Sequence, residues 1–313
     1  MDGSQAEVPD PGPTLPQSLC EAVDVLRDRP LEITELAGGL TNRNYKVVTP
    51  DGAYVVRISG TGSGALSIDR DNEYRNSVIA ARTGVGAPVH AYVPEESALV
   101  IGYIEGRTFR DEDFGGSGVI DRVAASCRRL HDGPRFVNDF DMFEIQARYL
   151  EIVLDQGFRL PDDYLEHALA VERIREALTV RAEPTVACNN DLLAGNFIDD
   201  GVIVRLIDYE YSGNNDACFE LGNIWSECHL TTGQLERLFT KYYGRHLVNK
   251  VARARLLGLI GQYGWTLWAS IQEASSDLEF EFWPWGMEKY ERAVATFRSA
   301  ELSRLIDDVQ RAD

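Results

Sequence analysis

The sequence predicts an α+β protein with a small, mostly β N-terminal lobe and a larger helical C-terminal lobe. Two patterns support this class. Between residues 30 and 104, five short runs rich in β-branched and aromatic residues are separated by turn residues. From Glu105 onward, apolar residues recur at helical spacing instead. With 313 residues, of which 44% are apolar, the chain is long enough for one large domain or two moderate ones.

The N-terminal lobe is expected over residues 17–104, after a segment at 1–16 whose Pro, Gly and acidic residues predict disorder. Pro50–Asp51–Gly52 lies between two β-rich runs and predicts a hairpin turn, because these residues favour the required backbone angles. Asp69 stands at the start of the second helix, and Gly84 follows its end. The expected elements are a helix at Leu19–Arg27, strands at Ile33–Leu36, Tyr45–Val48 and Ala53–Ile58, a helix at Asp69–Ala81, and strands at Val89–Tyr92 and Leu99–Ile104.

The C-terminal lobe, residues 105–313, is expected to be built mainly from helices. They are predicted at Val119–His131, Phe143–Asp155, Asp163–Thr179, Cys218–His229, Thr232–Tyr243, Val248–Glu273 and Trp283–Arg298. His131 ends the first of them. The helix dipole favours a histidine there, so a structural cap is the preferred interpretation of this residue.

The composition limits the partners. Acidic residues outnumber basic ones by 50 to 31, for a net charge of −19. This argues against nucleic acid and against an anionic membrane surface, since both require a positive field. An acidic surface can attract a cationic small molecule, but it can equally serve solubility alone.

The five cysteines are scattered and form no C-x-x-C pair. They are interpreted as reduced thiols, which predicts a cytoplasmic protein. No apolar run reaches the roughly 18 residues that span a bilayer, and the N-terminus lacks the basic start and apolar core of a signal peptide.

The stretch Ala187–Asp208 carries the strongest chemical pattern. Asp191 is followed by Asn196, and Asp208 closes the apolar run Val202–Ile207. Phosphoryl transfer needs a carboxylate that orients the attacking hydroxyl, and an amide oxygen and a second carboxylate that hold Mg²⁺. The spacing fits a loop followed by a short hairpin that returns Asp208 to the loop. Taken alone, the pattern is weak, and a surface loop before a strand explains it equally well.

The N-terminal hairpin offers candidates for phosphate binding. A glycine turn at Gly38–Gly39 precedes Thr41, Asn42 and Asn44, whose polar groups could donate to phosphate oxygens. An ordinary polar turn is the alternative. Arg57 lies within an apolar strand and needs a partner, because burying an unpaired charge is costly. The candidates are a nucleotide phosphate and a carboxylate on the next helix, where Glu73 lies; a surface salt bridge is the alternative.

The C-terminal helices are rich in aromatic residues. Trp265 and Trp268 are three apart and share one helix face, and Trp285 follows with Trp283 and Tyr290. Spacing alone favours a core stripe. The functional interpretation is a set of π-faces for a cation, the arrangement that recognises quaternary ammonium groups, with Glu227 as the counter-charge.

Several segments resemble the choline/ethanolamine kinase branch of the aminoglycoside-phosphotransferase-like superfamily. They are NNDLLAGNF, LIDYEYSGNNDACFELGNIWSE, the arginine in YVVRI, and GWTLWASIQ. The resemblance covers nearly all of residues 30–298 and is most specific around Asp208. It implies a bilobal protein-kinase-like fold and transfer of the γ-phosphoryl group of ATP to a small hydroxyl compound, with Mg²⁺.

The resemblance also implies roles for individual residues. Asp191 would take the substrate hydroxyl, and Asn196 and Asp208 would bind Mg²⁺. Arg57 would touch the ATP phosphates with Glu73 as its helix partner. The remaining assignments are Gly102 and Ile104 at the interlobe hinge near adenine, Thr41, Asn42 and Asn44 at the phosphates, and Glu210, Glu227, Trp265, Trp268 and Trp285 at the substrate.

One position departs from the family pattern, which usually has His-Asn-Asp where this chain has Asn189 first. Asn can also donate and accept hydrogen bonds, so activity is expected to survive. The expected substrate is choline or a related amino alcohol. An aminoglycoside kinase and a binding protein without turnover are the alternatives, and the sequence leaves open whether the chain acts alone or as a homodimer.

Overall fold

The computed structural model describes residues 13–37, 39, 41–60, 66 and 68–312. By their contacts the residues form two compact units. Unit 1 comprises the chain up to Gly60 together with Pro88–Tyr103, and unit 2 comprises Thr61–Ala87 and Ile104–Asp313. Gly38, most of the 1–16 segment and Asp313 lie outside the described residues, so the expected disorder at the N-terminus stays a prediction.

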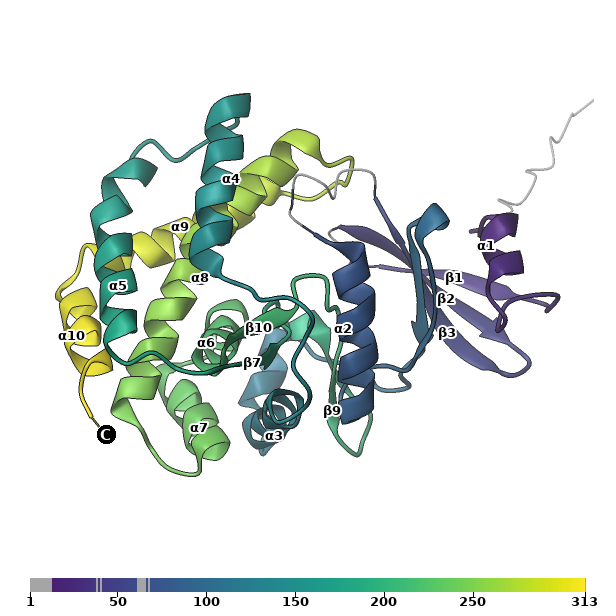
Figure 1. Cartoon of the computed structure of the whole chain (residues 1–313), viewed down its shortest axis with the longest axis horizontal. Helices are drawn as coiled ribbons and strands as arrows, with labels where there is room; N and C mark the ends of the chain where they lie inside the picture. Colours follow the sequence, from purple (N-terminus) through teal and green to yellow (C-terminus); the bar gives the residue numbers. More distant parts are fainter. Residues whose placement is uncertain (1–12, 38, 40, 61–65, 67, 313) are drawn as a thin grey trace, which may run out of the picture. The chain divides into compact units, whose positions relative to one another are not determined.

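Unit 1 is a five-stranded antiparallel sheet with the order β1-β2-β3-β5-β4 (Figure 1). The strands are β1 (Glu32–Leu36), β2 (Asn42–Thr49), β3 (Gly52–Ser59), β4 (Val89–Val93) and β5 (Ala98–Gly102). Each strand predicted from the sequence is present, and the hairpin turns at Pro50–Asp51 as expected. The last strand ends two residues before the predicted Ile104.

One face of this sheet is covered by the N-terminal segment. Leu19, Val23 and Leu26 are buried in one cluster with side chains of β2, β3 and β5. The predicted helix at Leu19–Arg27 is too long, because α1 (Gln17–Ala22) ends where Val23 becomes extended. The Arg27 guanidinium donates to the carbonyl of Glu21 at 2.6 Å and so satisfies the helix end. The apolar residues are buried by a helix and a turn instead of one helix.

The helix α2 (Arg70–Thr83) groups with unit 2, whereas the sequence analysis placed it in the small lobe. Asp69 caps its start by accepting from the backbone of Asn72, and Gly84 ends it in the left-handed conformation, both as predicted. Within unit 2 the Asn76 amide donates to Asn138 at 2.8 Å and to Ser212 at 3.0 Å. These bonds attach α2 to the segment before α4 and to the segment after the metal-site candidate Asp208.

The rest of unit 2 is mainly helical, as predicted. Its helices are α3 (Val119–His131), α4 (Met142–Gln156), α5 (Ala168–Val180), α6 (Ala217–Glu227), α7 (Thr232–Tyr243), α8 (Val248–Ser275), α9 (Phe282–Phe297) and α10 (Ala300–Val309). The predicted helix at Asp163–Thr179 is a 3-10 turn, Tyr164–His167, followed by α5. The last helix, α10, was not predicted, although Ser299 caps its start.

The helix α8 forms the centre of unit 2 and contacts α4, α6, α9 and α10 (Figure 1). Two glycines let its neighbours approach closely. A Cβ at Gly222 of α6 would lie 2.2 Å from the carbonyl oxygen of Ala254, and one at Gly286 of α9 would lie 2.5 Å from the Ala269 Cβ. Both α6 and α9 therefore pack directly against α8.

Short strands complete unit 2. β7 (Thr185–Cys188) pairs with β10 (Gly213–Asp216), and β8 (Phe197–Asp199) lies between β6 (Arg107–Thr108) and β9 (Val204–Leu206). β8 and β9 are the hairpin predicted between Asn196 and Asp208. None of the helices described here is long and apolar enough to cross a membrane.

Candidate active site

The loop that carries Asp191 begins directly after β7. Asn190 has a left-handed backbone, φ 68°, which turns the chain away from the strand. Its amide donates to the carbonyls of Tyr211 at 3.1 Å and Gly213 at 3.3 Å. A buried asparagine thus fixes the turn by tying it to the neighbouring segment, and Asp191 follows at a defined place.

The Asn189 side chain joins the two halves of the predicted site. Its amide nitrogen donates to the carbonyls of Ile207 at 3.0 Å and Asp208 at 2.8 Å, and its oxygen accepts from the backbone of Asp191 at 3.1 Å. Asn189 is fully buried. The expectation that an asparagine can both donate and accept at this position is confirmed.

Asn196 and the hairpin complete the convergence. The Asn196 amide donates to the Asp191 carbonyl at 2.7 Å, and the backbone of Ile207 donates to the Asn196 carbonyl at 3.0 Å. Asp208 itself has φ 63°, a conformation rare outside glycine. The structure therefore brings Asp191, Asn196 and Asp208 together, as the loop and hairpin predicted.

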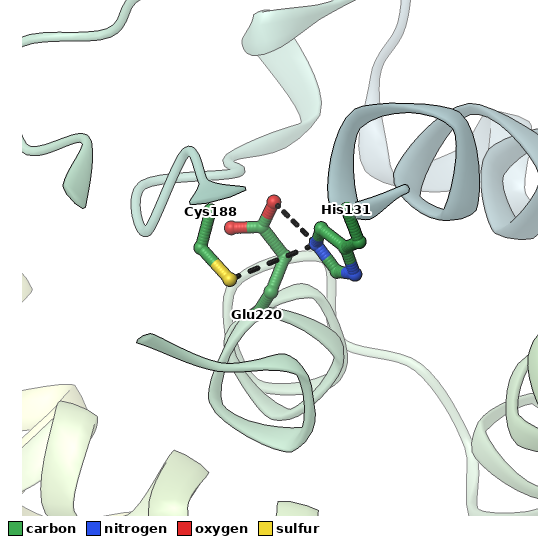
Figure 2. A group of neighbouring side chains, drawn as sticks. All are labelled: His131, Cys188 and Glu220. Atoms are coloured by element: carbon green, nitrogen blue, oxygen red, sulfur yellow. Dashed lines mark hydrogen bonds and ion pairs between the residues drawn. The ribbon is translucent and has the colours of Figure 1, made fainter. Parts of the chain in front are cut away.

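A buried carboxylate holds the backbone of this loop in place through hydrogen bonds. Glu220 of α6 accepts from the backbone of Asn189 at 3.0 Å and of Asn190 at 2.6 Å. Figure 2 shows His131 and Cys188 beside it, with the His131 Nε2 atom 3.3 Å from Glu220. The predicted role of His131 as a helix cap is incomplete, because its other ring nitrogen contacts Tyr242 at 2.8 Å and the ring links α3, α6 and α7.

His131, Cys188 and Glu220 are close enough to be considered as metal ligands. A metal would require a deprotonated thiol. Burial, followed by the nearby Glu220 charge, instead holds the pKa of Cys188 well above its usual value. Both Glu220 oxygens already accept backbone hydrogens. These residues fit a hydrogen-bonded support better than a metal centre.

The electrostatics of the loop favour a cation. Burial raises the pKa of Asp191 well above its usual value, and the neighbouring charges of Asp208, Glu210 and Glu227 raise it further, whereas Lys289 lowers it. Negative charge is therefore concentrated in a small volume. The oxygen ligands of Asn196 and Asp208 are the type that Mg²⁺ prefers, so the donor set fits that ion.

Glu210, predicted to face the substrate, contacts α2 within unit 2. One Arg70 nitrogen lies 2.7 Å from Glu73 and 3.1 Å from Glu210, and all three side chains are largely buried. Arg70 was not identified from the sequence. Arg70 attaches the start of α2 to the segment that follows Asp208. It also pairs with Glu73, the carboxylate that was predicted to pair with Arg57.

The predicted phosphate residues of unit 1 share one face of the sheet. Asn44 and Arg57 are direct partners in the β2–β3 register. Because side chains alternate along a strand, Asn42 and Lys46 lie on that face too, opposite the core face of Tyr45. Thr41 precedes the strand and its hydroxyl accepts from the Asn42 amide at 2.8 Å.

Arg57 and Glu73 belong to different units, so their pairing stays a prediction. The same holds for adenine contacts at the predicted hinge. Gly102 ends β5, and the chain passes from unit 1 to unit 2 between Tyr103 and Ile104. The Gly102 N–H already donates to the Pro88 carbonyl at 2.7 Å.

The tryptophans form a cluster that we call the aromatic box: Tyr211, Trp265, Trp268 and Trp285. Tyr211 packs edge-on against Trp265 at 5.0 Å between ring centroids and accepts from the Trp268 indole at 2.8 Å. Trp268 lies 5.3 Å from Trp285. The structure thus brings the three predicted tryptophans together, and Tyr211 is the member that the sequence analysis missed.

Trp283 and Tyr290, named with this group, lie elsewhere. The Arg159 guanidinium lies 4.1 Å from the Trp283 ring centroid. Tyr290 stacks on Tyr164 at 5.8 Å and donates to Asp163 at 2.6 Å.

Glu227, the predicted counter-charge, already has a cationic partner. Its carboxylate accepts from the Lys289 ammonium, and that ammonium lies 4.0 Å from the centroid of the Trp285 ring. Glu227 and Lys289 are 7% and 4% exposed. Lys289 was not predicted from the sequence as a member of this site, although it is one helical turn after Trp285 and so lies on the same helix face.

A pocket in unit 2 borders the box at Tyr211. It is lined by residues from the starts of α2 and α4 and from the segment after Asp208, including five acidic residues: Asp69, Asp139, Asp141, Glu144 and Glu210. Such a lining favours a cationic ligand over an anionic one.

Comparisons with known proteins show a family and several similar proteins. A family model for choline/ethanolamine kinase matches residues 33–243. Rat ethanolamine kinase 2 is 26% identical over 257 residues, which cover 73% of this chain. The match spans 66% of that relative, just under two thirds of its length.

Solved structures resemble the whole fold. The crystal structure of a choline/ethanolamine kinase family protein from Mesorhizobium loti has a TM-score of 0.82 and 29% identity, over 94% of this chain and 97% of that one. The choline kinase LicA from Streptococcus pneumoniae shares the fold, with a TM-score of 0.76 and 23% identity over 90% of this chain and 98% of its own. The predicted fold class is confirmed.

Proposed function

Since the chain belongs to the choline/ethanolamine kinase family, we propose that it is an ATP- and Mg²⁺-dependent kinase that phosphorylates the hydroxyl group of choline or a related amino alcohol. The observation that carries the proposal is the convergence of Asp191, Asn196 and Asp208. The Asn189 amide donates to the Asp208 carbonyl and accepts from the Asp191 backbone, and the Asn196 amide donates to the Asp191 carbonyl, so the three residues are held in one loop system.

The chemistry follows from the roles that these groups can take. Asp191 would accept a hydrogen bond from the substrate hydroxyl and orient it toward the γ-phosphoryl group. Asn196 and Asp208 would hold Mg²⁺, which neutralises charge on the phosphates when bound. Little covalent chemistry is required of the protein, so rate acceleration would come from positioning and from a prearranged electrostatic environment.

Nucleotide binding would involve the polar face of the unit 1 sheet. Asn42 and Asn44 of β2 and Arg57 of β3 supply two amides and a cation on one face, and Thr41 directly precedes β2. Pairing of Arg57 with Glu73, and adenine contacts at Gly102 and Ile104, belong to this proposal. LicA has been crystallised with AMP, which supports adenine-nucleotide use here.

The substrate assignment is supported by the aromatic box and by Glu227. Aromatic faces beside a carboxylate bind ammonium groups, and the acidic pocket at Tyr211 would attract a cation. An aminoglycoside is the second candidate, because that pocket holds many carboxylates. The buried tryptophans favour a small alcohol, since a polyhydroxylated sugar needs hydrogen-bonding partners that an indole face does not offer.

The test is ADP release with Mg·ATP and a panel of choline, ethanolamine, dimethylaminoethanol and several aminoglycosides. We expect turnover with at least one small amino alcohol. Turnover with aminoglycosides alone would reject the substrate class and retain the kinase.

If the protein bound nucleotide but released no ADP in the presence of any of these alcohols, the kinase proposal would be rejected in favour of a binding protein. The departure at Asn189 is the feature that keeps this alternative open. Asn189→His would then be the first variant to assay, because His is the family's usual residue at that position.

A further inference from the structure

The ammonium group of Lys289 lies between a carboxylate and an aromatic face. It contacts Glu227 and lies 4.0 Å from the Trp285 ring centroid, and Trp285 in turn packs on Trp268 at 5.3 Å. These are the two kinds of partner that recognise an ammonium group on a ligand. The chain therefore supplies a cation of its own to the aromatic box.

We propose that Lys289 is a specificity-determining residue that occupies the cation position of the aromatic box, so that an ammonium alcohol must displace it in order to bind there. The inference rests on the proposed function for the identity of the ligand. It concerns a residue of this chain for which the family pattern used in the sequence analysis gives no role.

Charge balance supports the proposal. Glu227 provides one negative charge to the box, and Lys289 neutralises it within a buried site. The second carboxylate oxygen of Glu227 lies 3.5 Å from the Ser226 hydroxyl. A ligand ammonium that enters beside Lys289 would place two cations on one carboxylate at low dielectric, which is unfavourable.

The contacts also distinguish between ligands. A primary ammonium such as that of ethanolamine can reproduce the hydrogen bond that Lys289 gives to Glu227. A trimethylammonium group has no N–H and a larger radius, so it cannot reproduce that bond at the same separation. Displacement of Lys289 is therefore more costly for choline than for ethanolamine, and removal of the lysine is expected to benefit choline more.

The experiment measures binding of choline and ethanolamine to the full-length protein by titration calorimetry. Lys289→Met keeps a similar volume and removes the charge. We expect its dissociation constant for choline to fall by about tenfold or more relative to the wild type, equivalent to about 1.4 kcal/mol. The gain for ethanolamine should be smaller. Lys289→Arg keeps the charge and should stay near the wild type.

Lys241→Met is the matched control, because Lys241 is an exposed lysine of α7 that pairs with Asp121. It should leave both dissociation constants unchanged. If folded Lys289→Met bound choline no more tightly than the wild type, Lys289 would not compete for the box and the inference would be wrong.

A second variant covers the case in which an unpaired Glu227 prevents folding. Replacing both members of a buried ion pair is often close to neutral, so the double variant E227Q/K289M should fold. Because Glu227 is itself the proposed counter-charge, the reference for the double variant is E227Q alone, which keeps the lysine. E227Q/K289M should bind choline more tightly than E227Q. Equal or weaker binding than E227Q would show that Lys289 is not an obstacle, and would overturn the inference.

Activity separates this inference from the proposed function. If Lys289→Met gains affinity but no variant releases ADP with any alcohol, the inference stands and the kinase proposal fails. If the wild type phosphorylates amino alcohols and Lys289→Met leaves KM unchanged, the kinase proposal stands and the inference fails.

Discussion

The catalytic loop and the aromatic box are held together in different ways. In the loop, short polar side chains bond to the backbone: Asn189, Asn190 and Glu220 together fix the positions around Asp191. In the box, large side chains contact one another, and the helices that carry its tryptophans, α8 and α9, approach closely at Gly286. One region is defined by backbone geometry and the other by helix packing.

The loop and the box should therefore respond differently to substitution. A loop fixed by backbone bonds loses its geometry when one buried donor or acceptor is removed, because the unsatisfied group pays the full cost of desolvation. A box made of side-chain contacts can adjust while its helices stay in place. Variants of the loop should therefore reduce turnover strongly, and variants of the box should mainly change the affinity for the alcohol.

The largest effect is expected for Asp191→Asn, which keeps the shape and removes the base. Turnover should fall by about 10²- to 10⁴-fold, the usual contribution of a positioned base, while nucleotide affinity is unchanged. Asp162→Asn, an exposed aspartate, is the control. Wild-type turnover in Asp191→Asn, measured as ADP release, would remove this residue from the mechanism.

The same variant should be more stable than the wild type at neutral pH. Because burial and the neighbouring carboxylates raise the folded-state pKa of Asp191, the folded state binds its proton more tightly than the unfolded state does. Stability is then lost as pH rises from the unfolded-state pKa through the raised folded-state pKa. Without Mg²⁺, the Tm of Asp191→Asn should exceed that of the wild type at pH 7, and the difference should shrink at low pH. An equal Tm at pH 7 would contradict the electrostatic argument.

Asn189→Asp should have the next largest effect. The substitution places a carboxylate oxygen opposite the carbonyls of Ile207 and Asp208, where an amide now donates. We expect a loss of about 2–4 kcal/mol in the free energy of unfolding, together with reduced turnover. Denaturant unfolding measures the first quantity, with the exposed Gln156→Glu as control. Unchanged stability would mean that this side chain does not join the two halves of the site.

Glu220→Gln should have a smaller effect, because an amide retains one acceptor oxygen. Its NH₂ group would face a backbone N–H of Asn189 or Asn190, which costs about 1–3 kcal/mol. Turnover should fall although Glu220 touches no reacting group, because the loop that carries Asp191 would shift. Glu176→Gln, at an exposed glutamate, is the control. If turnover in Glu220→Gln fell no further than in this control, Glu220 would have a purely structural role.

The sequence contains most of the information for the loop and less of that for the box. Asp191, Asn196 and Asp208 lie within 18 residues, so local spacing predicts both the turn and the hairpin. Trp265 and Trp268 share a face by helical period alone. The contact of Lys289 with Glu227 joins residues 62 apart, and no local pattern specifies it. The pairing of Arg70 with Glu210, 140 residues apart, was missed for the same reason.

The bounds of the helices were likewise predicted correctly where local signals determine them, and incorrectly where contacts distant in sequence do. Helices α3 and α7 have the predicted bounds, because both have regular apolar spacing, and Thr231 caps the start of α7. α1 is shorter than predicted, since the burial of Val23 and Leu26 is achieved by a turn. The contacts that attach α2 to unit 2 include those of Arg70 and Asn76, and neither residue is distinguishable in the sequence from other polar residues of a helix.

The smallest expected effect tests the box itself. Tyr211→Phe removes the acceptor of the Trp268 indole N–H, a buried bond of 2.8 Å, and leaves the ring that packs on Trp265. The loss of about 1 kcal/mol corresponds to roughly a fivefold increase in KM for the amino alcohol, with little change in kcat.

Tyr290→Phe is the matched control. It removes a hydroxyl that donates to Asp163 away from the box. Its KM should therefore stay at the wild-type value, while its free energy of unfolding falls by about 1 kcal/mol. If Tyr211→Phe lowered kcat and left KM unchanged, the hydroxyl would serve the catalytic loop through the Asn190–Tyr211 contact, and the loop and the box would have to be treated as one coupled region.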